Sequence, residues 1–165
     1  MFRQNGGDMI THHDIRLALP NEARRVAMMS RDFIETGLGW RWTSDRILKC
    51  LYDEATNVVV AGRDGEIAGF AIMEYAEDSS HLLLLAVRED ARRQGIGSAL
   101  LAWLEKTVLT AGIGKIYLEV RSRNEGARAF YRDLGYREIK LIRRFYRGQE
   151  DAIRLAKDMW VKPER

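Results

Sequence analysis

The chain has 165 residues, with 27 basic and 24 acidic side chains and 46% hydrophobic residues. This length suits one compact domain, and the composition is typical of a folded globule rather than a disordered chain. The longest apolar run, residues 82–87, is far shorter than the ~20 residues of a membrane-spanning helix. The polar first dozen residues lack the apolar stretch of a signal peptide, and the single Cys50 can form no disulfide within the chain. We therefore expect a cytoplasmic protein.

Charge is distributed unevenly along the chain. Residues 1–87 carry 9 basic and 13 acidic side chains, whereas residues 88–165 carry 18 and 11. A basic second half indicates contact with an anion, either nucleic acid or a small phosphorylated ligand. A solvated basic surface is the alternative.

Hydrophobic periodicity and turn residues predict the order of helices and strands. In chain order we expect a strand at 15–18, a helix at about 26–37, a helix capped by residue 43 or 44, strands at 58–61, 67–75 and 81–87, a helix at 96–112, a strand at 115–121, a short helix at 124–134, and strands at 137–146 and 152–159. Residues 1–13 are expected to form a flexible leader and residues 14–160 a single domain. The pattern indicates a mixed α/β (α+β) architecture.

A glycine-containing turn, Arg92-Arg93-Gln94-Gly95-Ile96-Gly97-Ser98, lies between a buried strand and a helix. The start of a helix presents unpaired N–H groups, and glycine lets the backbone approach an anion closely. The dinucleotide fingerprint would need a small residue at Leu100, and a P-loop would need Lys at Ser98. Neither motif fits, and a plain tight turn is the alternative.

From Arg92 to Gly97 the sequence resembles the R/Q-x-x-G-x-G/A turn of the GNAT superfamily of N-acetyltransferases. The segment 118–136 is similar to a second block of that superfamily, and 143–159 resembles its ribosomal-protein alanine N-acetyltransferase branch. The resemblance implies a single-domain GNAT fold. Its sheet would have six or seven largely antiparallel strands, a central parallel strand pair and helices on both faces.

The resemblance also implies acetyl-CoA as cosubstrate. The turn would hold the pyrophosphate, the preceding strand would pair with the pantetheine arm, and a backbone N–H near Val87 would face the oxyanion. The implied cofactor-binding residues are Leu85, Ala86, Val87, Arg92, Arg93, Gln94, Gly95, Ile96, Gly97, Ser98, Asn124 and Ala127. Asn124 is also a good N-cap for the helix that follows it.

Attack of an amine on a thioester needs a base for the amine and an acid for the departing thiolate. Glu119 lies mid-strand, where desolvation would raise the pKa of its carboxyl toward neutrality. An ion pair with Arg121 or Arg123, or a solvent-facing position, is the alternative. The resemblance places the catalytic base at Glu119 and the acid at Tyr131, and a core aromatic is the alternative for Tyr131.

The resemblance places Trp40, Trp42 and Tyr146 on the acceptor side, and an inward-packed lid is the alternative for the two tryptophans. Because the acidic first half contains the helices and loop expected there, we predict an acidic mouth that favours a cationic amine. His12, His13 and His81 have no Cys or carboxylate at ligand spacing, so we expect no metal site.

Together these features predict an acetyl-CoA-dependent N-acetyltransferase that acts on a protein or peptide N-terminal α-amine. The protein would be a monomer or homodimer, with no nucleic-acid or membrane partner. Three alternatives stay open: a small-amine acetyltransferase for a polyamine, amino acid or antibiotic, a non-catalytic acyl-CoA-binding module, and a basic nucleic-acid binder.

Overall fold

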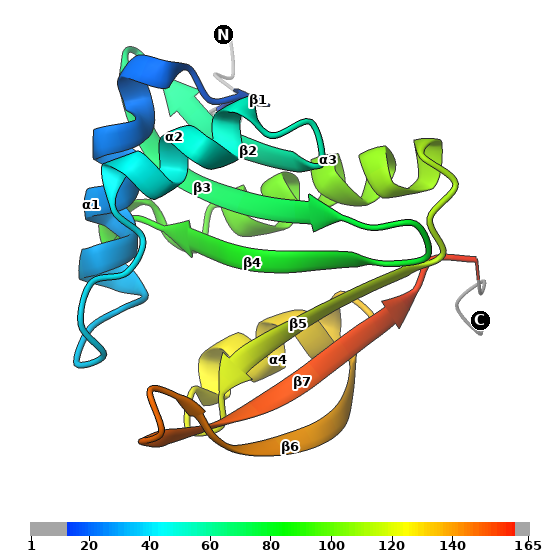
Figure 1. The fold of residues 1–165 in the computed structure, drawn as a ribbon. Helices are drawn as coiled ribbons and strands as arrows, with labels where there is room; N and C mark the ends of the chain where they lie inside the picture. Colours follow the sequence, from blue (N-terminus) through cyan, green and yellow to red (C-terminus); the bar gives the residue numbers. More distant parts are fainter. Residues whose placement is uncertain (1–12, 161–165) are drawn as a thin grey trace, which may run out of the picture.

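The computed structural model describes residues 13–160, in which one seven-stranded sheet carries helices on both faces (Figure 1). The predicted leader lies almost entirely outside the described residues. The elements are β1 (Asp14–Leu17), α1 (Ala23–Phe33), α2 (Ser44–Tyr52), β2 (Thr56–Arg63), β3 (Glu66–Tyr75), β4 (Ser80–Val87), α3 (Ile96–Thr110), β5 (Lys115–Arg121), α4 (Glu125–Asp133), β6 (Arg137–Tyr146) and β7 (Glu150–Asp158). Two single 3-10 turns, Pro20–Glu22 and Glu89–Ala91, precede α1 and the glycine turn.

The sheet has the strand order β1-β2-β3-β4-β5-β7-β6. All neighbouring strands are antiparallel except β4 and β5, which are parallel. Helices α1 and α2 cover one face, and α3 and α4 cover the other (Figure 1). The predicted fold class, with its central parallel pair and two covered faces, is therefore confirmed.

Local sequence signals explain where several elements begin. The Thr43 hydroxyl accepts a hydrogen bond from the backbone N–H of Arg46 and caps α2. The Asn124 side chain accepts from the N–H of Ala127 and caps α4, as predicted. Asp64 and Gly65 both adopt positive φ, the geometry of a tight two-residue hairpin turn between β2 and β3.

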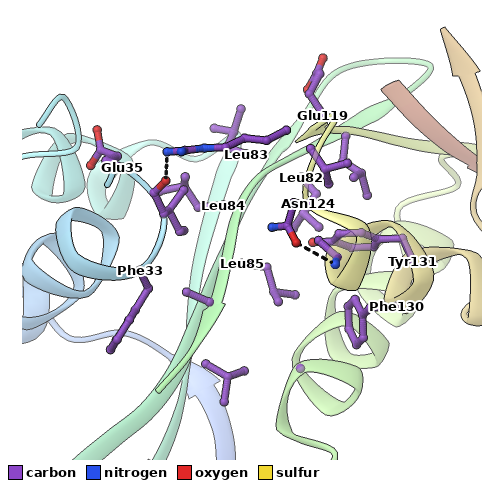
Figure 2. Close-up of a pocket in the computed structure, with 18 of the residues that line it drawn as sticks. Phe33, Glu35, Leu82, Leu83, Leu84, Leu85, Glu119, Asn124, Phe130 and Tyr131 are labelled. Atoms are coloured by element: carbon purple, nitrogen blue, oxygen red, sulfur yellow. Dashed lines mark hydrogen bonds between the residues drawn. The ribbon is translucent and has the colours of Figure 1, made fainter. Parts of the chain in front are cut away.

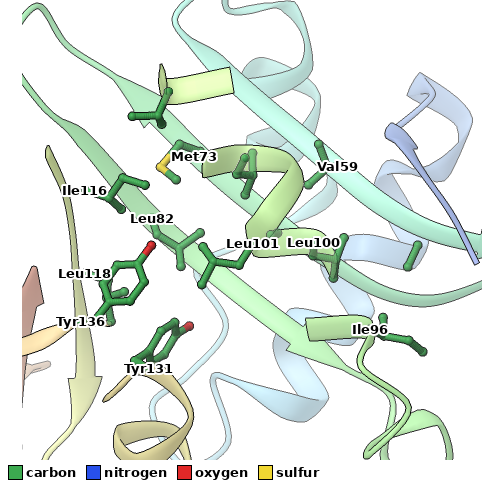
Figure 3. Packing of buried hydrophobic residues seen from close by; sticks show 14 of the residues in the cluster. Val59, Met73, Leu82, Ile96, Leu100, Leu101, Ile116, Leu118, Tyr131 and Tyr136 are labelled. Carbon is green, nitrogen blue, oxygen red and sulfur yellow. The ribbon is translucent and has the colours of Figure 1, made fainter. Parts of the chain in front are cut away.

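Each face of the sheet buries its own apolar cluster. On the α3 side, Leu100 and Leu101 pack against β3 and β4 residues such as Met73 and Leu82, and Tyr136 closes the cluster near α4 (Figure 3). On the α1 side, residues of both helices pack against β2, β3 and the second half of β4. Because both clusters use β4, this strand is covered on both sides, which explains its unbroken apolar run.

Strands β4 and β5 are joined along only part of their length. They pair at Ser80–Leu82 with Ile116–Leu118 and then separate (Figure 1). A register shift places Leu83 as an extra residue of β4 opposite β3, because Ile72 pairs with Leu84 and Met73 with Leu82. The bulge and the separation create an open seam, which leaves backbone groups on the inner edge of β4 without a strand partner. The bulge lies at Leu83, four positions before Val87, where we expected the backbone donor.

No helix among residues 13–160 is long and apolar enough to cross a membrane.

Candidate active site

A single cleft of about 1060 Å³ runs through the open seam and reaches both faces of the sheet. Its walls come from β4, the glycine turn, β5, α4, the loop between α1 and α2, and the β6–β7 hairpin. Of the site residues that the sequence predicted, Gln94 and Trp40 do not line the cleft. Those that do are Trp42, Leu85, Ala86, Val87, Arg92, Arg93, Gly95, Ile96, Gly97, Ser98, Glu119, Asn124, Ala127, Tyr131 and Tyr146.

The glycine turn forms one end of the cleft. Gly95 caps α3 in a left-handed conformation with φ of +77°, and Arg93 also has positive φ. The first N–H groups of α3 have no acceptor within the helix and form the positive end of its dipole. The Arg92 Nε donates to the carbonyl of Val87 at 3.3 Å, which ties the turn to the end of β4. The arrangement is suited to an anion.

Gly97 has a packing role that the sequence did not reveal. A Cβ at this position would lie 3.3 Å from the Phe130 ring and 3.7 Å from Val87. The missing side chain therefore lets the first turn of α3 approach α4 closely.

The Glu119 carboxylate is 5% exposed and has two partners. One oxygen lies 2.6 Å from His81 Nε2, and the other accepts from Arg154 Nη2 at 2.8 Å. Burial alone would raise the pKa of Glu119, but the hydrogen bonds from His81 and Arg154 outweigh it, so the pKa lies below its ordinary value. The expected rise in pKa was wrong, and the ion pair is with Arg154 rather than with Arg121 or Arg123.

His81 lines the cleft and was missed as a functional residue by the sequence reasoning. It lies on β4 directly beside Tyr117 of β5, and the two rings stack with centroids 4.3 Å apart. The parallel register then places Glu119, two residues further along β5, within hydrogen-bonding distance. No group of three or more potential metal ligands is found in the described part of the chain.

Tyr131 projects from α4 toward the seam, across from Leu85 of β4 (Figure 2). Its ring packs edge-on against Phe130 and Tyr136, and burial raises the pKa of its phenol above the ordinary value. The Tyr136 hydroxyl donates to Glu105 at 2.9 Å on the α3 side, so Tyr136 belongs to the core. Tyr131 thus combines the core position and the cleft position that the sequence left as alternatives.

The two tryptophans of the α1–α2 loop have different surroundings. Trp42 lines the cleft, and the guanidinium of Arg46 lies 3.7 Å above its ring. Trp40 is 42% exposed, and its indole N–H is shared between the carbonyls of Ala27 and Trp42. Trp40 therefore braces the loop from outside the cleft.

The same loop is held by one buried carboxylate and one arginine. Glu35 accepts from the backbone N–H groups of Arg41 and Trp42 and from the Ser30 hydroxyl. Arg121 of β5 donates to the carbonyls of Ile34 and Thr36, at 2.7 and 2.8 Å. These bonds fix the loop against the strand that carries Glu119.

The end of the cleft beside the α1–α2 loop and the β6–β7 hairpin, where the resemblance places the acceptor, is rich in arginine, so the predicted acidic mouth was wrong. We refer to this end as the acceptor side. Its charged lining residues are Glu35, Arg41, Arg46, Glu119, Arg121 and Arg147. The prediction summed the charge of a half-chain, but many of that half's carboxylates point elsewhere, and Arg121 and Arg147 come from the other half.

The family model of the acetyltransferase (GNAT) family matches residues 26–136. That range is more than half of the chain and contains β2 to α4, including the turn and the seam. The chain belongs to the GNAT acetyltransferase family.

Individual relatives agree with this assignment. The chain is 39% identical over 97 residues to the Escherichia coli ribosomal protein bS18 alanine N-acetyltransferase, covering 57% of this chain and 66% of that protein. It is 40% identical over 99 residues to an uncharacterized N-acetyltransferase of Methanocaldococcus jannaschii, covering 59% and 64%. The matched regions thus span slightly less than two thirds of these relatives. The crystal structure of the Escherichia coli ribosomal-protein-S18-alanine N-acetyltransferase superposes with a TM-score of 0.75 at 28% identity, covering 93% of this chain and 97% of that one.

Proposed function

We propose that the protein is an acetyl-CoA-dependent N-acetyltransferase whose acceptor is the N-terminal α-amine of a protein or peptide. The observation that carries this proposal is the open seam between β4 and β5. It brings the Glu119–His81 pair, the Tyr131 ring and the glycine turn into one cleft. The GNAT family uses acetyl-CoA, and the residues of this chain suit that cosubstrate.

Three features of the cleft fit acetyl-CoA. The unpaired N–H groups at the start of α3, together with Arg92 and Arg93, would hold the pyrophosphate. The free inner edge of β4, at Leu83 to Leu85, would pair with the amides of the pantetheine arm. When bound, acetyl-CoA supplies a thioester carbon to which the amine nitrogen bonds, while the C–S bond breaks and its electron pair leaves with sulfur.

The base in this proposal is the Glu119–His81 pair rather than Glu119 alone. A carboxylate with a lowered pKa is a weak base but a good hydrogen-bond acceptor. If Glu119 accepts from Nε2–H of His81, the imidazole keeps a lone pair on Nδ1. That nitrogen can take the amine proton, directly or through a water molecule, and Glu119 stabilises the resulting imidazolium.

Tyr131 is the proposed acid. Its raised pKa keeps the phenol protonated throughout the neutral range, so its proton is available when the thiolate leaves. The same desolvation raises the proton affinity of a thiolate in the cleft, which favours the transfer. We assign the oxyanion donor to the backbone of β4 near the bulge at Leu83 instead of near Val87.

A peptide acceptor is supported by the relatives. Besides the bS18 alanine enzyme, an N-alpha-acetyltransferase of Sulfolobus acidocaldarius is 26% identical over 158 residues, covering 88% of this chain and 92% of that protein. The fold alone does not decide the acceptor, because an aminoglycoside 6′-N-acetyltransferase has a TM-score of 0.75 at 19% identity. A small amine is therefore the second candidate acceptor.

The test is release of free CoA from acetyl-CoA with three acceptor sets: peptides with free N-termini, the same peptides with acetylated N-termini, and small amines. We expect turnover of free N-termini only. Equal turnover of blocked peptides that contain lysine would refute the α-amine acceptor. CoA binding without turnover of any acceptor would instead favour a non-catalytic acyl-CoA-binding module.

A further inference from the structure

Three arginines on the acceptor side of the cleft have no carboxylate partner within residues 13–160. They are Arg41 of the α1–α2 loop, Arg46 of α2 and Arg147 of the β6–β7 turn. Their exposed side chains are nevertheless partly held in place. The Arg46 guanidinium is stacked on Trp42, and Arg147 Nη2 donates to the carbonyl of Gly39 at 3.2 Å. The three guanidinium groups therefore present positive charge at the cleft entrance that no carboxylate of the described residues neutralises.

The carboxylates of this region are already engaged with groups of the protein. Glu35 accepts from the two loop N–H groups and from Ser30, and Glu119 is held by His81 and Arg154. Glu150, at the start of β7, lies 2.6 Å from Arg123 and 3.5 Å from Arg121. The other oxygen of Glu150 is buried without a hydrogen-bond partner among residues 13–160, and none of the three carboxylates pairs with Arg41, Arg46 or Arg147. The acceptor entrance therefore carries an excess of positive charge.

We propose that the acceptor is a peptide whose N-terminal amine is followed within a few residues by acidic side chains. The inference rests on the proposed N-acetyltransferase function and specifies the substrate class of the same site. The guanidinium groups offer paired donors that match carboxylates. A basic peptide would instead bring like charges together in a partly enclosed cleft, which is unfavourable.

The positive entrance also affects the reacting amine. An ammonium group next to several guanidinium groups loses its proton more readily, because nearby like charge lowers its pKa. The neutral amine is the nucleophile, so this environment favours the reactive form. Acidic side chains on the acceptor supply the attraction that a lone ammonium group would lack there.

The test compares three peptides of equal length that share the N-terminal residue and carry Glu, Gln or Lys at positions two to four. We expect kcat/KM for the acidic peptide to exceed that for the basic peptide by about tenfold or more at low salt, with the neutral peptide in between. The difference should shrink as added salt screens the charges.

Charge reversal links the preference to this surface. The double variant Arg41→Glu and Arg147→Glu should abolish or invert the order of the three peptides. Arg24→Glu is the matched control, because Arg24 is exposed on α1 outside the cleft and has no ion pair in the described structure. It should keep the wild-type order.

The outcomes separate this inference from the function on which it rests. Equal or faster turnover of the basic peptide would overturn the acidic acceptor while leaving the N-acetyltransferase proposal intact. An acidic preference that survives in the double variant would equally overturn the role of these arginines. Failure to acetylate any peptide, with acetyl-CoA still bound, would refute the proposed function itself, and the inference with it.

Discussion

His81 Nε2 and Glu119 Oε2 lie 2.6 Å apart, although 38 residues separate them in the sequence. The contact exists because β4 and β5 are parallel neighbours up to Leu82 and Leu118, at the edge of the open seam. The second oxygen of Glu119 is held by Arg154 of β7. Three adjacent strands therefore fix the position of one carboxylate and one imidazole where the cleft crosses the sheet.

We predict that His81→Ala and Glu119→Gln each reduce kcat by about 10²-fold or more, the usual contribution of a positioned base. Steady-state rates of CoA release from acetyl-CoA, with a peptide that has a free N-terminus as acceptor, measure this loss. Glu105→Gln is the control, because Glu105 pairs with Lys157 and Tyr136 away from the cleft. Full activity of both cleft variants across pH 6 to 9 would refute the proposed base.

The lowered pKa of Glu119 also predicts a pH dependence of stability. Its folded-state pKa lies below the unfolded value, so the ionised group stabilises the fold above about pH 4.5, and this contribution disappears as pH falls through the folded pKa. Urea unfolding should therefore show that Glu119→Gln is less stable than the wild type at pH 7, and that the difference shrinks as the pH is lowered below about 4.5. A difference that stays constant over this pH range would contradict the lowered pKa.

Replacement of Tyr131 by Phe should lower kcat by about 10²-fold while leaving the affinity for CoA nearly unchanged, because only the hydroxyl is lost. Tyr136→Phe is the matched control in the same cluster. It removes a hydroxyl that donates to Glu105, so we expect reduced stability with the rate retained. CoA titration by calorimetry and single-turnover kinetics measure the two properties separately. A Tyr131→Phe enzyme with wild-type kcat would leave Tyr131 as a core aromatic only.

Gly95→Ala tests the glycine turn. Gly95 and Gly112, at the two ends of α3, both have positive φ, and an added Cβ would contact nothing within 4 Å in either case. Each Ala variant should therefore lose about 1 kcal/mol of unfolding free energy from backbone strain alone. Only Gly95→Ala should weaken CoA binding, since it distorts the N–H groups at the start of α3. Equal CoA affinity in both variants would argue against the turn as the phosphate site.

Local signals in the sequence predicted most of the fold. The boundaries of β5 and β6, the Asn124 cap and the Asp64-Gly65 hairpin depend on periodicity and turn chemistry within a few residues, which a sequence displays directly. The family resemblance implied a central parallel strand pair, which the structure forms from β4 and β5. The bulge at Leu83 did not, because an extra residue in a run of four leucines leaves no mark in the hydrophobic pattern.

The electrostatics of the site could not be predicted in the same way. The partners of Glu119 come from two other strands, and only the register of the sheet selects Arg154 over the nearer Arg121 and Arg123. The sign of its pKa shift then follows from these contacts rather than from burial. The arginine-rich acceptor side has the same origin, since Arg147 reaches it through the β6–β7 hairpin.

Arg121 provides the last prediction, because it separates positioning of the loop from chemistry. Its Nη2 donates to two carbonyls of the α1–α2 loop while its Nη1 lies 3.5 Å from Glu150, and the single nitrogen of a lysine cannot serve the loop and the carboxylate together. Arg121→Lys should therefore raise KM for the acceptor peptide severalfold and leave CoA affinity unchanged, with a stability loss of about 1 to 3 kcal/mol. Arg123→Lys, two residues along and also paired with Glu150, should change neither constant appreciably. If Arg121→Lys instead lowered kcat at unchanged KM, the arginine would act on the reacting groups rather than on the loop.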